Sequence, residues 1–88
     1  PVTATIEITV RADKSILFRD RSTADKEIEV VRFEVGSMVK KRQEKNANQS
    51  VVIAADKTLP YEEVMKVMDA LREANVKRIG LLAKPRKG

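Results

Sequence analysis

The chain has 88 residues and a formal net charge of +5, and hydrophobic and charged residues make up 42% and 35% of it. This balance is typical of one small globular domain and excludes a disordered chain. Because cysteine and histidine are both absent, disulfides and Ser–His or Cys–His nucleophilic pairs are excluded, and a zinc, copper or haem site is not expected. The positive charge favours an anionic partner such as nucleic acid, anionic lipid or an acidic wall polymer, although it also serves solubility.

No apolar run approaches the roughly 20 residues that a bilayer-crossing helix requires. The chain begins at Pro1 without an initiator methionine, and its start does not read as a signal peptide. We therefore interpret residues 1–88 as a single domain excised from a longer protein, with any targeting or membrane segment upstream.

The first part of the chain predicts a β-hairpin. Apolar and polar residues alternate over residues 3–10, which is typical of a half-buried strand. Asp13-Lys14-Ser15 predicts a tight turn, because Asp and Ser side chains bond locally to the backbone. Residues 16–18 predict the second strand, and the polar residues 20–26 predict a loop.

The segment from Glu27 to Lys45 fits two interpretations. Its start is rich in β-branched residues, which favours a strand. Its basic end suits the carboxyl end of a helix. The apolar residues also follow the spacing of one helix face: Ile28, Val31, Val35, Met38 and Val39. We predict a helix, although Gly36 within it costs about 1 kcal/mol relative to alanine.

The rest of the chain predicts a βαβ unit. Residues 51–55 are apolar at both odd and even positions, as in a strand covered on both faces of the sheet. Pro60 predicts the start of a helix, and Asn75 suits its left-handed end. The apolar stripe of this helix contains Tyr61, Val64, Met65, Met68 and Leu71. Residues 79–83 predict a parallel strand, and residues 84–88 a flexible basic tail.

The predicted fold is an α+β two-layer sandwich in the order β-β-α-β-α-β, with a mixed sheet and two helices on one face.

No group of residues in this arrangement indicates catalysis. Glu62 and Glu63 point roughly 100° apart on a helix, so they suit the positive helix end rather than a shared substrate. Asp56-Lys57-Thr58 follows a strand but lacks the glycines of a phosphate-binding loop, so it predicts a turn and a helix cap. We expect no enzyme, cofactor or metal.

A basic cluster at the end of the first helix is a candidate contact for an anionic partner: Lys40, Lys41, Arg42 and Lys45. A solvated helix end is the better interpretation. Nucleic-acid modules usually add aromatic side chains that stack on bases. Because we expect Phe18, Phe33 and Tyr61 in the core, we expect no nucleic acid, with a small RNA-binding domain as the remaining alternative.

Met65 and Met68 predict core packing, with a partner surface as the alternative.

Residues 51–83, VVIAADKTLPYEEVMKVMDALREANVKRIGLLA, resemble the ExbD/TolR family. The likeness rests on the strand that ends in Ala55-Asp56-Lys57, on the helix start Pro60-Tyr61-Glu62, and on Met65-Lys66-Val67-Met68-Asp69 leading to Ile79-Gly80-Leu81. Asn75 stands where the family usually has glycine, which is compatible with a helix end.

This resemblance implies a periplasmic domain that forms a homodimer and follows a single transmembrane helix in the bacterial inner membrane. It implies an ExbB- or TolQ-type channel subunit and a TonB- or TolA-type transducer as partners. The proton motive force would then drive outer-membrane transport in the ExbD branch. In the TolR branch, which also binds peptidoglycan, it would serve envelope integrity.

The sequence leaves these two branches open. By resemblance, Asp56, Pro60, Tyr61 and Leu81 match the family pattern. With Met65 and Ile79 they are the candidate partner-binding residues. Core packing is an equally good interpretation of each of these residues.

Overall fold

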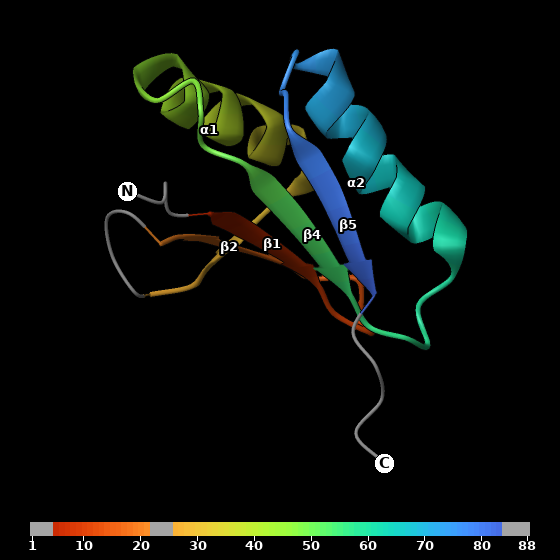
Figure 1. Ribbon diagram of the computed structural model, residues 1–88. Helices are drawn as coiled ribbons and strands as arrows, with labels where there is room; N and C mark the ends of the chain where they lie inside the picture. Colours follow the sequence, from red (N-terminus) through yellow and green to blue (C-terminus); the bar gives the residue numbers. More distant parts are fainter. Residues whose placement is uncertain (1–4, 22–25, 84–88) are drawn as a thin grey trace.

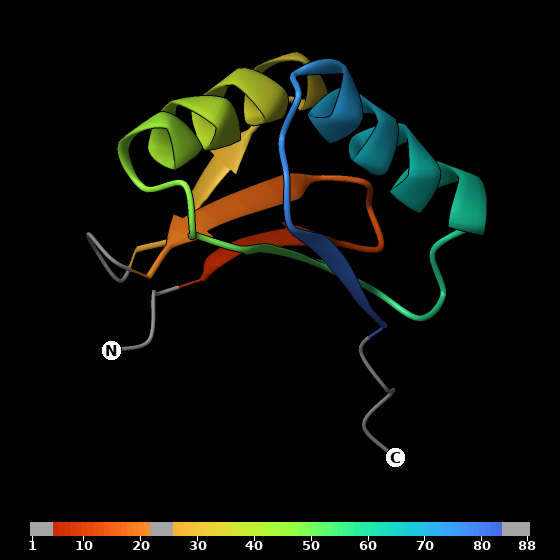
Figure 2. The same cartoon turned by 45° about the horizontal axis from the view of Figure 1, so that its top comes forward.

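The computed structural model describes residues 5–21 and 26–83. This part of the chain forms a five-stranded sheet in the order β3-β2-β1-β4-β5, with α1 and α2 on one face (Figures 1 and 2). The predicted α+β fold, a mixed sheet with helices on one face, is confirmed. The elements in chain order are β1 (Ile6–Val10), β2 (Ile16–Asp20), β3 (Ile28–Val30), α1 (Arg32–Lys45), β4 (Val51–Ala55), α2 (Tyr61–Glu73) and β5 (Ile79–Ala83).

The predicted hairpin is confirmed, since β1 and β2 pair antiparallel with Ile8 opposite Phe18. Asp13 builds the turn between them. Its Oδ1 accepts hydrogen bonds from the Ser15 N–H at 3.0 Å and from the Ser15 hydroxyl at 2.7 Å. Lys14, between them, takes a left-handed backbone with φ of 74°. These local bonds satisfy polar groups at the point where the chain reverses.

The predicted helix from Glu27 is wrong at its start. Ile28–Val30 form β3, which pairs antiparallel with β2 and places Val30 opposite Ile16. The helix begins at Arg32, and the Val31 carbonyl accepts the first N–H groups of its opening turn. β-Branched residues fit a pleated surface, so pairing with β2 prevails over the helical spacing of these positions.

The predicted βαβ unit is confirmed, because β4 runs parallel to both β1 and β5. α2 buries Val64, Val67 and Leu71, and Asn75 takes the expected left-handed conformation with φ of 63°. The predicted covering of β4 on both faces is confirmed only in part, because Ala54 on the second face is 7% exposed but neither α1 nor α2 covers that face. Both helices lie on the same side of the sheet, and Val52 on the other side is half-buried.

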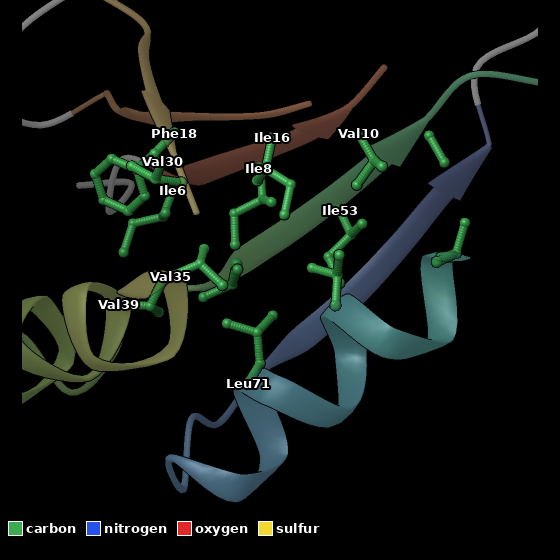
Figure 3. Packing of buried hydrophobic residues seen from close by; sticks show 14 of the residues in the cluster. Ile6, Ile8, Val10, Ile16, Phe18, Val30, Val35, Val39, Ile53 and Leu71 are labelled. Atoms are coloured by element: carbon green, nitrogen blue, oxygen red, sulfur yellow. The ribbon is translucent and has the colours of Figure 1, made fainter. Parts of the chain in front are cut away.

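The core lies between the sheet and the two helices, where aliphatic side chains from both layers meet (Figure 3). Ile8, Ile53 and Leu71 are completely buried there. Phe18 is 2% exposed, which confirms its predicted core position. Phe33 is 89% and Tyr61 67% exposed, so the predicted core positions of these two residues are wrong. Aliphatic residues therefore supply almost all of the buried apolar surface.

Helix α1 approaches α2 closely at Gly36. A Cβ atom at this position would lie 2.7 Å from the carbonyl oxygen of Ala70 and 3.0 Å from the Cβ of Ala74. Real Cβ atoms do not approach backbone oxygens so closely. The glycine that lowers helix propensity is therefore what permits this helix contact.

Candidate functional site: the edge strand β5 and the outer side of α2

The predicted partner-binding residues all lie in the β4–α2–β5 unit. Asp56 and Pro60 belong to the loop between β4 and α2, and Tyr61 and Met65 lie on the first turns of α2. The remaining two lie on β5, the outermost strand of the sheet on this side (Figure 1). The structure thus brings most of this set to one edge of the sheet.

The outer side of β5 presents backbone groups to solvent. The Val51 N–H donates to the carbonyl of Arg78 at 3.0 Å, which sets how β5 pairs with β4. Backbone groups of successive strand residues point to opposite sides within the sheet, so those of Ile79 and Leu81 point away from β4. No strand in the described part of the chain pairs with this outer side. β5 is therefore an open edge that can accept a further strand.

The outer side of α2 stands above this edge. Ala70 and Ala74 face α1, because both lie against Gly36. With 3.6 residues per turn, the side turned away from α1 carries Tyr61, Met65 and Met68. Tyr61 is exposed and both methionines are half-buried. This stripe is therefore not buried as a whole, which leaves apolar surface for a partner.

Leu81 and Ile79 continue this apolar surface onto the sheet. Leu81 pairs with Ile53, whose side chain is completely buried beneath the helices, so Leu81 points to the same face. Its side chain is 45% exposed, whereas Ile79 packs partly against the core. We name the combined surface the α2–β5 ledge. It consists of Tyr61, Met65, Met68, Ile79 and Leu81.

The loop before α2 has a structural role. Asp56 Oδ1 accepts the Thr58 N–H at 2.8 Å and the Thr58 hydroxyl at 2.6 Å, and the Asp56 N–H donates to Val10 at 3.0 Å. The predicted turn is confirmed, but the predicted cap is wrong, because the residue before α2 is Pro60 and no side chain in the described part of the chain caps this helix. Within the predicted acidic pair, the Glu63 carboxylate lies 3.3 Å from Lys66 and 3.8 Å from Lys14, so it is held by cations.

The basic cluster at the end of α1 is divided by the structure. Lys41, Arg42 and Lys45 line a hollow of about 190 Å³, together with Met38. Arg42 also turns inward, since its Nε lies 3.5 Å from Asp20 Oδ2 and its guanidinium lies 5.5 Å from the Phe18 ring centre. Lys41 and Lys45 are exposed and Lys40 is half-buried. Arg42 therefore anchors the helix end as well as carrying charge.

A buried polar network at the same end of the molecule was not predicted. Asp20, Gln43 and Gln49 are each less than a tenth exposed. Gln49 Nε2 donates to Asp20 Oδ1 at 2.9 Å, and Gln43 Oε1 accepts the Lys77 N–H at 2.9 Å. A sequence signal did exist, because Gln43 continues the four-residue spacing of Val35 and Val39 along the inner face of α1.

A second exposed apolar surface, also missed, lies near the opposite edge of the sheet. Ile28, Val31 and Phe33 are 46%, 55% and 89% exposed. A groove of about 340 Å³ lies beside them, between β3, the start of α1 and α2. Arg32 and Glu63 both line this groove, so its charges are mixed.

Comparison with known proteins agrees with this fold and with the resemblance noted in the sequence. The family model for biopolymer transport protein ExbD/TolR matches residues 1–86. The biopolymer transport proteins ExbD of Neisseria gonorrhoeae and of Neisseria meningitidis serogroup B are each 43% identical over 49 residues. This match covers 56% of the chain but 34% of each relative, so the chain spans about a third of their length.

Within the described residues, neither helix combines the length and the apolar character that a membrane crossing requires. The family model nevertheless covers the chain almost from end to end. The protein therefore belongs to the ExbD/TolR family of biopolymer transport proteins.

Proposed function

We propose that this domain is the periplasmic part of an inner-membrane complex that couples the proton motive force to outer-membrane transport by docking a TonB-type transducer. The observation that carries this proposal is the α2–β5 ledge, where an open strand edge and an exposed apolar stripe adjoin. Membership of a family of biopolymer transport proteins supports a transport component rather than an enzyme.

Docking by strand addition suits the geometry of the ledge. An extended transducer segment would bond to the outward-facing backbone groups of Ile79 and Leu81. Its alternate side chains would pack beneath α2, against Met65 and Tyr61. Backbone hydrogen bonds and apolar contacts respond weakly to ionic strength, whereas contacts between exposed charges are screened by salt. This mode of binding therefore differs measurably from electrostatic attraction.

The remaining partners in this proposal follow from the family resemblance. The domain would act as a homodimer and would join an ExbB-type channel subunit through a membrane helix upstream of it. Strand addition at β5 leaves the opposite edge, at β3, free for other contacts within such a complex.

An NMR titration tests the docking proposal. The ¹⁵N-labelled domain is titrated with the periplasmic region of a TonB-type transducer at low and at high salt. We expect amide shifts along β5 and the first turns of α2, of similar size in both buffers. Shifts that cluster at the end of α1 and vanish at high salt would contradict docking at the ledge, as would the absence of any shift.

The second candidate is a TolR-type component that binds peptidoglycan for envelope integrity. The observation that favours it is the pair of exposed lysines, Lys41 and Lys45, beside the hollow at the end of α1. The named relatives are ExbD proteins, which favours the first candidate. Titration with soluble peptidoglycan fragments separates the two, because this role requires salt-sensitive shifts at the end of α1 and none on β5.

A further inference from the structure

Positive charge gathers at one end of the molecule, where both helices end and where β1, β4 and β5 begin. Arg42 contacts Asp20 at the end of β2 at 3.5 Å. Gln43 of α1 binds the Lys77 N–H in the loop before β5. These contacts place the end of α1, the end of β2 and the loop after α2 together. We name the basic residues found there the cationic end: Arg21, Lys41, Arg42, Lys45, Lys77 and Arg78.

Acidic groups offset this charge only in part. Asp20 is buried and lies against Arg42, so its charge is already compensated. Arg21 is also paired, since its Nη1 lies 3.2 Å from the Glu7 carboxylate, whereas Glu44 and Glu73 remain exposed nearby. Apart from Arg42, the basic residues of the cationic end are exposed. The favourable interaction of cations with helix carboxyl ends explains the lysines within α1. It does not explain Lys77 and Arg78, which follow α2.

The opposite end of the molecule is electrically balanced in the described residues. Arg11 lies 3.9 Å from Asp13, and Lys14 lies 3.8 Å from Glu63. The turn before α2 likewise combines Lys57 with an acidic neighbour. The described part of the domain is therefore polarised along its strands, with the excess of positive charge at one end.

The amino-terminal segment joins the fold at the cationic end. The Ile6 N–H donates to the Ser50 carbonyl at 2.9 Å, and the Arg21 N–H donates to the Thr5 carbonyl at 3.2 Å. Figure 1 shows β1 starting on the same side as the end of α1. A membrane anchor upstream of β1, as in the proposed function, would bring this end of the domain nearest to the bilayer.

We propose that the cationic end docks on a bilayer surface that carries anionic headgroups. The inference rests on the proposed function, because the upstream anchor decides which end faces the membrane. A row of exposed lysines and arginines needs no preformed pocket to bind such a surface, and each lysine near it strengthens binding roughly fivefold. Phe33 and Tyr61 lie at the starts of α1 and α2, away from this end, so it offers no exposed aromatic for stacking on nucleic-acid bases.

Docking would also orient the candidate transducer site. β5 begins at the cationic end and runs away from it, parallel to β1. With the cationic end on the bilayer, the α2–β5 ledge would extend away from the membrane toward an approaching transducer. A docked domain would therefore present its open edge in a fixed direction.

Vesicle sedimentation tests this inference with two matched variants of the chain. One variant carries Lys41→Gln, Lys45→Gln and Lys77→Gln at the cationic end. The control carries Lys14→Gln, Lys57→Gln and Lys66→Gln elsewhere, so each variant lowers the formal charge from +5 to +2. We expect the unmodified chain to sediment with vesicles of phosphatidylglycerol and phosphatidylcholine, not with phosphatidylcholine alone, and to dissociate as salt rises.

The first variant should bind at least tenfold more weakly, given roughly fivefold per lysine, and the control should stay within about twofold of the unmodified chain. Equal losses in both variants would show attraction by net charge alone and would overturn the inference. So would undiminished binding by the first variant, which would place the contact outside the cationic end. Sedimentation with insoluble peptidoglycan but not with anionic vesicles would assign this surface to the wall polymer instead.

Two further measurements separate loss of vesicle binding from unfolding of the variants and from loss of transducer binding. Circular dichroism melting curves that match the unmodified chain would show that both variants are folded. The transducer titration should be unchanged in the first variant, because its substitutions lie outside the α2–β5 ledge. Vesicle binding without transducer binding would contradict the docking function and leave the membrane contact standing.

Discussion

Helices α1 and α2 cover the same face of the sheet, but different interactions hold each of them there. α2 buries an apolar stripe of Val64, Val67 and Leu71. α1 buries Val35 and Val39, and its other buried positions are a glycine and a glutamine. α2 is therefore held mainly by non-directional apolar burial. α1 depends on a close backbone approach and on directional hydrogen bonds.

This difference matches the two surfaces that the helices support. Beside α2, the ledge offers apolar side chains and an open strand edge, which can adapt to a bound segment. At the end of α1, Arg42 and Gln43 tie the helix to β2 and to the loop before β5. The cationic end is therefore attached to a fixed point of the fold. Substitutions in each helix can test this comparison.

The largest effect is expected from removing apolar contacts beneath α2. Leu71→Ala should lower the free energy of unfolding by about 3 kcal/mol, since Leu71 is completely buried. Val39→Ala, its counterpart in α1, should cost about 2 kcal/mol because it removes fewer buried carbons. Urea unfolding followed by circular dichroism measures both. A larger loss in Val39→Ala would contradict the view that apolar burial holds α2 more than α1.

The second effect comes from the glutamine in α1. Gln43→Leu should lower the free energy of unfolding by about 2 kcal/mol, because buried polar groups lose their partners. The affected groups are the carbonyls of Gln49 and Lys77 and the Lys77 N–H. Arg72→Gln, in the last turn of α2, is the control. Its exposed ion pair should contribute less than about 0.5 kcal/mol. Equal stability of Gln43→Leu and the unmodified chain would refute the directional role of this side chain.

Gly36→Ala should destabilise the domain by about 1–2 kcal/mol, because the new methyl group would collide with the backbone of α2. The sign of this change in stability distinguishes packing against α2 from helix propensity. In a solvent-exposed helix the same substitution would stabilise by about 1 kcal/mol through helix propensity. Ser37→Ala, at the neighbouring exposed position, controls for propensity and should change stability by less than about 0.5 kcal/mol. Stabilisation by Gly36→Ala would show that the helices can separate freely at this point.

The same contrast explains what the sequence could predict about the fold. α2 and β5 follow from local signals, namely Pro60 at the helix start, an apolar stripe and Asn75 at the helix end. β3 could not be distinguished from helix, because its β-branched residues favour a strand while Ile28 also fits the spacing of the predicted helix face. The residues of β3 pair with residues of β2 that stand 10 or more positions earlier in the chain, so a contact between two separate segments decides the structure. Three residues are also too few for an alternating pattern to be recognised.

Side-chain burial was harder to predict than the elements themselves. Gln43 is buried because its hydrogen-bond partners belong to residues 49 and 77, and the latter lies 34 positions away in the chain. Tyr61 lies on an apolar stripe, yet it is exposed because α2 turns this side away from α1. For the candidate site, the resemblance indicated Leu81. That β5 is an edge strand depends on the strand order of the whole sheet.

Edge strand β3 directly precedes α1 and edge strand β5 follows α2. The difference between the two helices can therefore be tested at the two sheet edges as well. Leu81 on β5 and Ile28 on β3 are 45% and 46% exposed, and both belong to edge strands. Leu81→Asp should weaken transducer binding at least tenfold, about 1.4 kcal/mol, because it places a charge within the apolar ledge. Ile28→Asp should leave the affinity within about twofold. Isothermal titration calorimetry measures both, and equal losses would show that the transducer does not distinguish the edges.

The smallest effect concerns the two Asp-Lys-Ser/Thr turns at the end opposite the cationic end, one before β2 and one before α2. The Ser15 hydroxyl and N–H donate to Asp13 and hold the pKa of its carboxyl below the ordinary value. The folded state therefore binds this proton less tightly than the unfolded state. The resulting stability is present above the ordinary pKa and is lost as the pH falls through the lowered one. Because the Asp13 side chain is exposed to solvent, this contribution is small.

Ser15→Ala should raise the pKa of Asp13 toward its ordinary value, because it removes the hydroxyl that donates the shorter of the two hydrogen bonds. Thr58→Ala, the equivalent change in the turn before α2, should leave the Asp13 titration unchanged. Carboxyl ¹³C shifts followed by NMR between neutral and acidic pH report both results. An Asp13 titration that responds equally to both substitutions would mean that the two turns are coupled across the adjoining ends of β1 and β4. The hairpin beneath α1 and the unit that carries α2 could then no longer be treated as separate.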